Sequence, residues 1–108
     1  MKIKISMKII FKPNEVVIKA SDSEHILGQV VNKGKLILTN QRVYFVQQLE
    51  ETTENIFEVL PSEIIDVMNF KTGWLSKNGL SITKKDGILL KFRLKNSQQW
   101  IESIAGMC

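Results

Sequence analysis

The stretch GKLILTNQRVYFV, residues 34–46, predicts a β-hairpin with one defined register. A two-residue turn at Asn40 and Gln41 is favoured, because tight hairpin turns prefer asparagine. In this register, the large apolar side chains of one face are Leu36, Leu38, Val43 and Phe45. Ile37 pairs with Tyr44 on the other face. A shift of one residue would divide the apolar set between both faces, so the hydrophobic pattern specifies the register.

A second hairpin is expected in GLSITKKDGILLKFRL, residues 79–94. A three-residue loop at residues 85–87, ending on a glycine that can adopt a left-handed conformation, pairs Ile82 with Leu90. A two-residue turn would instead place Ile82 opposite Lys91. The apolar pattern therefore favours the longer loop.

Three shorter strands complete a set of seven, and they are expected at residues 15–20, 56–60 and 64–70. Pro61 cannot donate to a strand ladder, so it belongs in the turn between the last two strands. Two polar stretches read as connections, and these are residues 21–33 and 47–55.

The C-terminal end is the segment with helical periodicity. Asn96 can cap a helix, with Gln99 three residues later to complete a capping box. One face of this helix carries Trp100, Ile101, Ile104 and Met107. Because a sheet of seven strands tends to curl, we expect a mainly β fold: a bent, barrel-like antiparallel sheet whose open end is plugged by the helix.

The chain has 108 residues, the size of one domain, and a formal net charge of +4. The charge resides in the N-terminal leader, residues 1–12, whose four lysines precede the first acidic residue. In residues 13–108, basic and acidic residues are equal in number, eleven each. A nucleic-acid-binding domain would carry its charge on a face of the fold, so we expect no nucleic-acid partner.

The leader alternates like a β-strand and is expected to form a basic N-terminal strand or arm, followed by one domain over residues 13–108. Its apolar side chains are Ile3, Ile5, Met7, Ile9 and Phe11. Such a strand can pair with the edge of its own sheet, or with a neighbouring subunit by strand addition or exchange. A disordered basic tail or a lipid contact is the third alternative.

No catalytic constellation is recognisable in the sequence. His25 is the only histidine, reads as part of a polar acidic loop, and has no cysteines at metal-ligand spacing. The glycines stand singly rather than in a phosphate-binding loop. We therefore expect no enzymatic activity, no cofactor, no metal and no small-molecule substrate. Cys108 is the only cysteine, which excludes a disulfide framework and favours a cytoplasmic protein.

Several short motifs resemble the GRAM-domain pattern, over roughly residues 14–105. The motifs are Gly34-Lys35-Leu36, Leu38-Thr39-Asn40, Arg42-Val43 with Phe45, Leu60-Pro61, Asn78-Gly79-Leu80, Lys85-Asp86-Gly87 and Trp100-Ile101. The single-domain bacterial members are the most similar. The resemblance implies a pleckstrin-homology-like (PH-like) fold, with seven strands in a bent barrel capped by a C-terminal helix. It also implies binding of phosphoinositides, other membrane lipids or protein partners, without catalytic activity.

The resemblance further implies that the first, third and sixth connections form the rim that usually takes an inositol phosphate. The charged residues expected there are Asp22, Glu24, Glu50, Glu51, Glu54 and Asp86, against Lys33, Lys84 and Lys85. Phosphate recognition prefers converging lysines and arginines, and this rim has no arginine. The usual headgroup site is therefore expected to be absent.

The remaining connections are expected to gather a different patch, made of Arg42, Lys71, Trp74, Leu75 and Lys77. An aromatic side chain among cations suits a membrane interface or a protein anchor, although Trp74 can equally fold back over the end of the barrel. We therefore predict a non-catalytic binding module that recognises a protein partner or a second copy of itself. The alternative is a peripheral membrane protein that binds phosphoinositide or anionic lipid through this patch and the leader.

Overall fold

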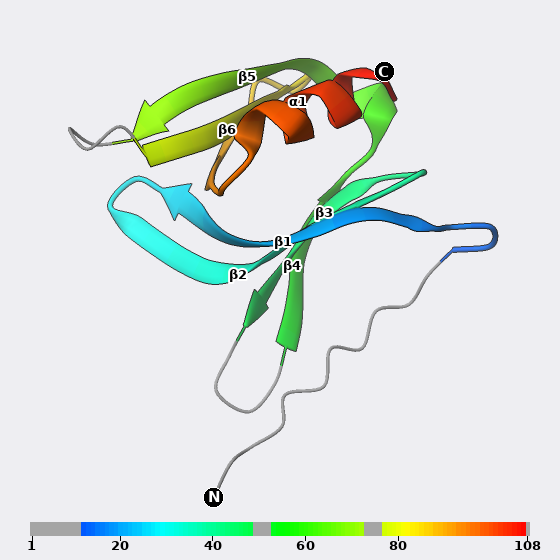
Figure 1. The fold of residues 1–108 in the computed structure, drawn as a ribbon, viewed down its shortest axis with the longest axis horizontal. Helices are drawn as coiled ribbons and strands as arrows, with labels where there is room; N and C mark the ends of the chain where they lie inside the picture. Colours follow the sequence, from blue (N-terminus) through cyan, green and yellow to red (C-terminus); the bar gives the residue numbers. More distant parts are fainter. Residues whose placement is uncertain (1–11, 49–52, 73–76, 108) are drawn as a thin grey trace, which may run out of the picture.

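The computed structural model describes residues 12–48, 53–72 and 77–107, with the backbone alone for residues 48, 53–57, 71, 72, 77 and 78. These residues form seven strands followed by one α-helix (Figure 1). The strands are β1 (Val17–Leu27), β2 (Val30–Thr39), β3 (Val43–Gln48), β4 (Thr53–Val59), β5 (Ile64–Thr72), β6 (Lys77–Lys84) and β7 (Leu89–Arg93). A short 3-10 turn, Pro61–Glu63, joins β4 to β5, and the helix is α1 (Ser97–Ala105).

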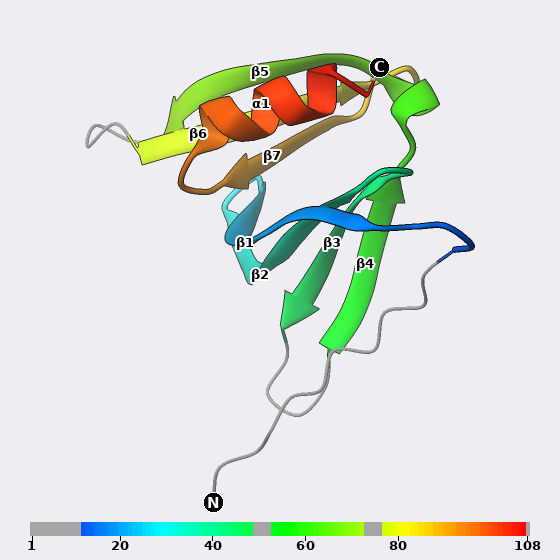
Figure 2. The ribbon, with the colours of Figure 1, turned by 45° about the vertical axis from the view of Figure 1, so that its right-hand side comes forward.

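The seven strands form one antiparallel sheet in the order β4-β3-β2-β1-β7-β6-β5. The sheet bends where β1 meets β7, so that β5, β6 and β7 lie over β1–β4 in both ribbon views (Figures 1 and 2). β4 and β5 are the two edges of this sheet. The fold is therefore the bent antiparallel sheet with one C-terminal helix that the sequence predicts.

Both predicted hairpin registers are confirmed. β2 and β3 pair with Leu38 opposite Val43 next to the turn. β6 and β7 pair through the longer loop, with Ile82 opposite Leu90. The φ of Gly87 is 89°, which is the left-handed conformation that the three-residue loop requires. Apolar alternation was sufficient to define both registers, because one face of each hairpin packs in the core.

The main core lies between the two layers of the bent sheet, and α1 packs against β5 and β6 on that side (Figure 2). Its buried side chains are Leu36, Leu38, Val43, Phe45, Val59, Ile64, Leu80, Ile82, Phe92, Leu94, Trp100 and Ile104. The predicted helix is confirmed, but Asn96 has a φ of 59° and makes no side-chain cap hydrogen bond. The first turn is instead tied to β5, because Ser97 Oγ donates to Asn69 Oδ1 at 2.9 Å.

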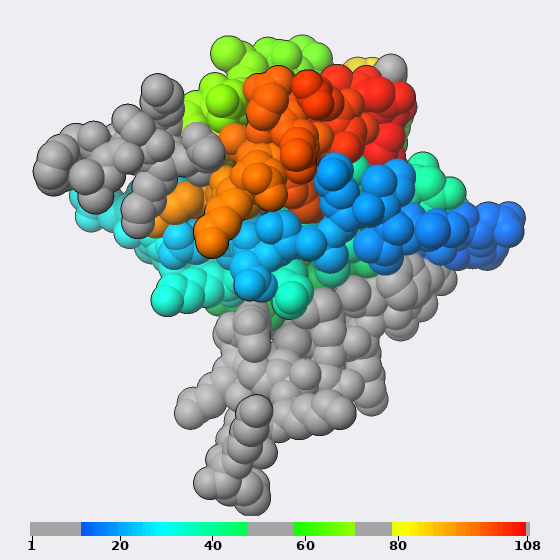
Figure 3. Space-filling view, in the orientation of Figure 1, coloured from blue at the N-terminus to red at the C-terminus, as the bar shows by residue number. Residues whose placement is uncertain are grey.

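The chain at the start of β1 runs along the surface of the molecule, below α1 in the space-filling view (blue and orange to red in Figure 3). Val16, Val17 and Ile18 in this segment are exposed.

The predicted connection at residues 21–33 is wrong, because most of it is paired strand. β1 continues to a turn at Gly28, whose φ is 61°, and then returns as β2. Asp22 lies opposite Lys35 in the sheet, and their side chains form an ion pair at 3.3 Å. Charged residues on a solvent-facing strand break the apolar alternation on which the prediction depended.

The predicted connection at residues 47–55 is also shorter in the structure, because β3 ends at Gln48 and β4 begins at Thr53. Residues 1–11 of the leader lie outside the described residues, so the N-terminal strand stays a prediction.

Candidate functional sites

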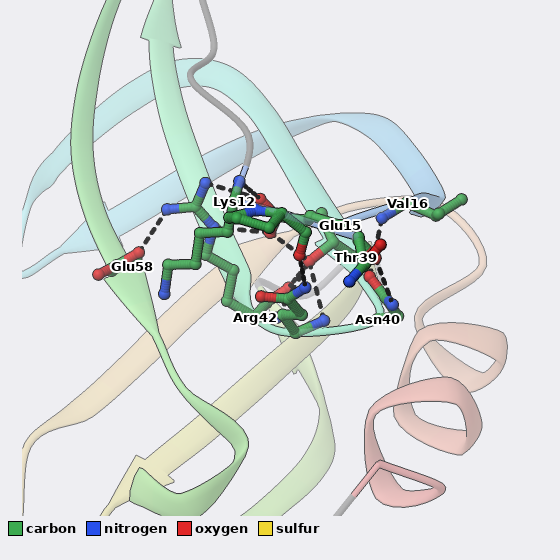
Figure 4. A network of polar contacts seen from close by, with 10 residues as sticks. Lys12, Glu15, Val16, Thr39, Asn40, Arg42 and Glu58 are labelled. Carbon is green, nitrogen blue, oxygen red and sulfur yellow. Dashed lines mark hydrogen bonds and ion pairs between the residues drawn. The ribbon is translucent and has the colours of Figure 1, made fainter.

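Arg42 follows the β2–β3 turn and is the centre of a buried polar network (Figure 4). Its Nε and Nη2 donate to Glu15 Oε2 and Oε1 at 2.8 and 2.9 Å, so this contact is bidentate. Its Nη1 donates to Glu58 Oε2 at 2.6 Å. The guanidinium carbon also lies 4.6 Å from the ring centroid of Tyr44. The side chains of Arg42 and Glu15 are 8% and 0% exposed, so their ion pair is buried.

The same network fastens the chain before β1 to the β2–β3 turn (Figure 4). Thr39 Oγ1 donates to Glu15 Oε2 at 2.6 Å. Asn40 Oδ1 accepts a hydrogen bond from the Val16 N–H at 2.8 Å, and Asn40 Nδ2 donates to the Asn14 carbonyl at 3.0 Å. These contacts fix the position at which the chain enters the sheet.

The network keeps both partners of the buried ion pair charged. Hydrogen bonds from Arg42 lower the pKa of Glu15 from 4.5 to about 2, with a smaller contribution from Thr39 and an opposing one from burial. The hydrogen bonds to Glu15 raise the pKa of Arg42 in turn. The guanidinium is thus committed to two carboxylates and is hardly accessible to an external anion.

The sequence analysis missed Glu15 and Glu58 as partners of Arg42, although strand pairing contains the signal. In an antiparallel pair the start of β1 lies beside the end of β2, so Glu15 is brought to the β2–β3 turn. Glu58 lies opposite Tyr44, two residues beyond Arg42, in the β3–β4 register. The position of Glu15 beside the β2–β3 turn could be derived only with the correct length of β1.

The structure does not bring Arg42 together with Lys71 and Lys77 of the predicted patch. The β2–β3 turn and the end of the β5–β6 hairpin lie on opposite sides of the molecule in both ribbon views (Figures 1 and 2). Lys71 and Lys77 lie at that hairpin end, with the backbone alone described, while Trp74 and Leu75 lie outside the described residues. The prediction assumed that alternate connections share a rim, and the sharp bend of the sheet separates these two.

In the predicted acidic rim, the carboxylates of Glu24 and Asp86 are paired with basic side chains. Glu24 lies within β1, and its Oε1 accepts a hydrogen bond from Arg93 Nη1 at 2.9 Å. At the β6–β7 loop, Lys84 Nζ lies 3.6 Å from Asp86 Oδ2. Arg42 and Arg93 are the only arginines of the sequence, so every guanidinium of the chain is bound to a carboxylate.

The predicted loop position of His25 is wrong, because the residue lies in β1 with its ring in the core. Its ring centroid is 5.7 Å from that of Phe45 and 5.3 Å from that of Phe92. Burial lowers the pKa of His25. Across residues 12–48, 53–72 and 77–107, no group of three histidine, cysteine, aspartate or glutamate residues could hold a metal ion.

Besides Val16, Val17 and Ile18, two groups of exposed apolar side chains lie on the described surface. The first, the β5–β7 patch, consists of Ile65 and Met68 on β5 and of Ile88 and Leu89 at the start of β7, with β6 between the two strands. The second, the β1–β2 hairpin tip, consists of Leu27, Val30 and Val31. Neighbouring apolar residues that are left in contact with water are a common feature of interaction surfaces. In the part of the chain that the structure describes, no helix is long and apolar enough to span a membrane.

No family model and no curated protein matches the chain, whereas solved structures match most of it. The C-terminal domain of an unknown protein from Leishmania infantum has a TM-score of 0.73 at 13% identity, covering 88% of this chain and 85% of that one. The Vps36 N-terminal PH domain has a TM-score of 0.68 at 15% identity, covering 91% and 85%. The Slm1-PH domain in complex with inositol-4-phosphate has a TM-score of 0.64 at 13% identity, covering 84% and 96%. The fold of this chain is therefore PH-like.

Proposed function

We propose that this chain is a non-catalytic PH-like binding module of the GRAM type that recognises a protein, with a second copy of itself as the first candidate. The ion pairing of both arginines carries the preference for protein over phosphate. Arg42 and Arg93 already donate charge-assisted hydrogen bonds to glutamates, and a phosphate would have to displace these carboxylates first. A site built from lysines alone lacks bidentate recognition.

The β5–β7 patch supports a protein partner. Met68 and Leu89 lie on the outer face of the sheet, because their chain neighbours Val67 and Leu90 pack against the core. β5 is an edge of the described sheet, so one side of its backbone can pair with a strand of another molecule. Antiparallel pairing of two β5 strands about a two-fold axis would join the apolar patches of two copies.

A lipid ligand is the second candidate, and the β1–β2 hairpin tip favours it. Leu27, Val30 and Val31 are between 42 and 64% exposed, and Lys33 follows them in β2. An apolar hairpin end beside a lysine suits the interfacial region of an anionic membrane. The structurally similar Slm1-PH domain has been solved with inositol-4-phosphate. The predicted residues Lys71 and Trp74 belong to this candidate.

Light scattering of the full chain over a range of concentrations tests self-association. We expect a dimer mass that falls toward the monomer on dilution, and Met68→Lys should shift the protein to the monomer. Gln98→Lys adds the same charge at an exposed position of α1 and should leave the mass unchanged. A monomer at every concentration would exclude self-association. A dimer that ignores Met68→Lys would exclude this surface.

Sedimentation with phosphatidylcholine vesicles, with and without phosphatidylserine or phosphatidylinositol 4-phosphate, tests the lipid candidate. A protein-binding module should stay in the supernatant with every vesicle. A lipid binder should pellet with the anionic vesicles at low salt and less so at physiological salt. Val30→Asp, Trp74→Ala and Lys71→Glu should each weaken such pelleting. Salt-sensitive pelleting of the wild type would therefore favour the lipid candidate over the protein candidate.

A further inference from the structure

Three side chains are buried on the face of strands β1–β4 that points away from the main core. Ile37, Tyr44 and Val46 form a cluster of their own, and they are 3%, 0% and 3% exposed. They alternate along β2 and β3 with residues of the main core, so they lie on the outer face of the sheet. A side chain on an outer face is fully buried only when something lies over it. We call Ile37, Tyr44 and Val46 the outer cluster.

The described residues account for a small part of that cover. Arg42 lies over the ring of Tyr44. Ala20 is opposite Ile37 and Lys35 is opposite Val46 in the sheet, so both flank the outer cluster in the plane of the strands. Strand neighbours at this spacing limit access from the side and do not form a covering layer. The described side chains therefore do not form a covering layer over the outer cluster.

The described chain begins at the border of the outer cluster and with a reversal of direction. The Glu15 N–H donates to the Lys12 carbonyl at 3.1 Å, and the Lys12 N–H donates to Glu15 Oε1 at 2.9 Å. Pro13 and Asn14 are the central residues of this turn, and the φ of Asn14 is 61°, as a type II turn requires. Glu15, the last residue of this turn, accepts hydrogen bonds from Arg42 (Figure 4), and Arg42 lies over the ring of Tyr44.

The preceding segment has the composition and length of a suitable cover. In extended form its eleven residues would span roughly 36 Å, at about 3.3 Å per residue. This is longer than β2, β3 or β4. We propose that residues 1–11 pack as an extended segment over the outer cluster of their own chain, with their apolar side chains turned toward it. These side chains are Ile3, Ile5, Met7, Ile9 and Phe11, and the lysines of the other face remain in water.

One observation favours the segment of the same chain over that of a second copy. The turn at residues 12–15 is fastened to the β2–β3 turn of its own chain, with Gln41 Nε2 donating to the Pro13 carbonyl at 2.8 Å. A short tether gives the attached segment a high effective concentration over any untethered competitor.

A nitroxide spin label at residue 6 tests the contact directly. The label is attached to Ser6→Cys in a Cys108→Ser background, on the face of the segment that is turned to solvent. We expect the amide signals of β2 and β3 near the outer cluster to lose intensity, while those of α1 keep it. In an equimolar mixture of spin-labelled protein without 15N and unlabelled 15N protein, the loss should disappear. Full intensity at β2 and β3 in the first sample, or an equal loss in the mixture, would overturn the proposal.

A pair of matched variants tests the orientation of the segment. Ile5→Lys/Ile9→Lys places two charges on the apolar face, and Ser6→Lys/Ile10→Lys places two on the other face. The first variant should lower the thermal midpoint and increase the fluorescence of the dye 1-anilinonaphthalene-8-sulfonate, which binds exposed apolar surface. The second variant should leave both close to the wild type. Equal effects of the two variants would contradict the orientation. Both experiments are carried out in the Met68→Lys background, which removes the proposed β5 contact between copies, so their outcome does not depend on self-association.

Discussion

Glu15→Gln removes the charge that holds Arg42 and keeps the shape of the side chain. The buried guanidinium then retains Glu58 as its charged partner and loses its bidentate contact. Removing one partner of a buried ion pair is destabilising, because the other charge stays out of water without full compensation. We therefore expect Glu15→Gln to reduce the free energy of unfolding at neutral pH.

The magnitude follows from the pKa of Glu15, which falls from 4.5 to about 2 in the folded protein. At about 1.4 kcal/mol per pH unit, this shift corresponds to roughly 3 kcal/mol of stability. Glu58 is partly exposed, so water screens part of the network, and we expect about 2 kcal/mol. Because the folded-state pKa is lowered, this contribution is complete above pH 4.5 and is lost as the pH falls toward 2.

Urea unfolding followed by tryptophan fluorescence, from pH 7 down to about pH 2, measures this contribution. Wild type should exceed Glu15→Gln by about 2 kcal/mol at pH 7, and the difference should close as Glu15 takes up a proton. Burial lowers the pKa of His25, so stability also decreases below pH 6.5, but this loss is common to both proteins. Glu102→Gln, at an exposed position of α1, is the control and should stay within about 0.5 kcal/mol of wild type. Equal stability at pH 7, or a difference that persists at pH 2, would refute the reasoning.

Three further substitutions test the packing around β2, β3 and β6. The hydroxyl of Tyr44 is buried and has no hydrogen-bond partner among the described residues, so Tyr44→Phe should raise the urea midpoint and add up to about 1 kcal/mol; a loss of stability would reveal a partner for the hydroxyl. Gly34→Ala would force a Cβ onto the carbonyl oxygen of Val46 and should lower the free energy of unfolding by about 3 kcal/mol in the same assay. The Cβ of Gly79→Ala meets the ring of Phe70 instead. Because this ring can rotate away, we expect a loss of about 1 kcal/mol. An equal cost at both glycines would contradict this difference between a fixed backbone and a movable ring.

The parts of the fold that the sequence predicts correctly are those in which one face of an element is apolar. The hairpin registers around Leu38 and Ile82 follow from alternation, because a slipped register would expose the core residues. The helix follows from the spacing of Trp100 and Ile104, both of which are buried. In these elements a local pattern and the global fold require the same arrangement.

The errors of the sequence-based prediction arise where polar residues form a strand, or where the bend of the whole sheet determines which residues lie together. Asp22 and Glu24 occupy a strand, since cross-strand partners of opposite charge replace the apolar pattern. His25 lies between these polar residues in sequence, and its side chain nevertheless points into the core, because successive residues of a strand face opposite sides. The separation of Arg42 from Lys71 follows from the bend of the whole sheet, for which no local pattern exists.

The unequal pairing of β1 has a consequence for how the molecule opens. β1 pairs with β2 at ten positions and with β7 at three, from Glu24 to Ile26. In the described sheet, strand pairing joins the block of β1–β4 to the block of β5–β7 and α1 at these three positions. We call these three positions the seam. Each block retains its own ladders when the seam parts, so partial unfolding should separate the blocks before either one frays. Amide hydrogen exchange at the seam will then report the opening of the core. A partner that strains one block will affect the other block through these three pairs.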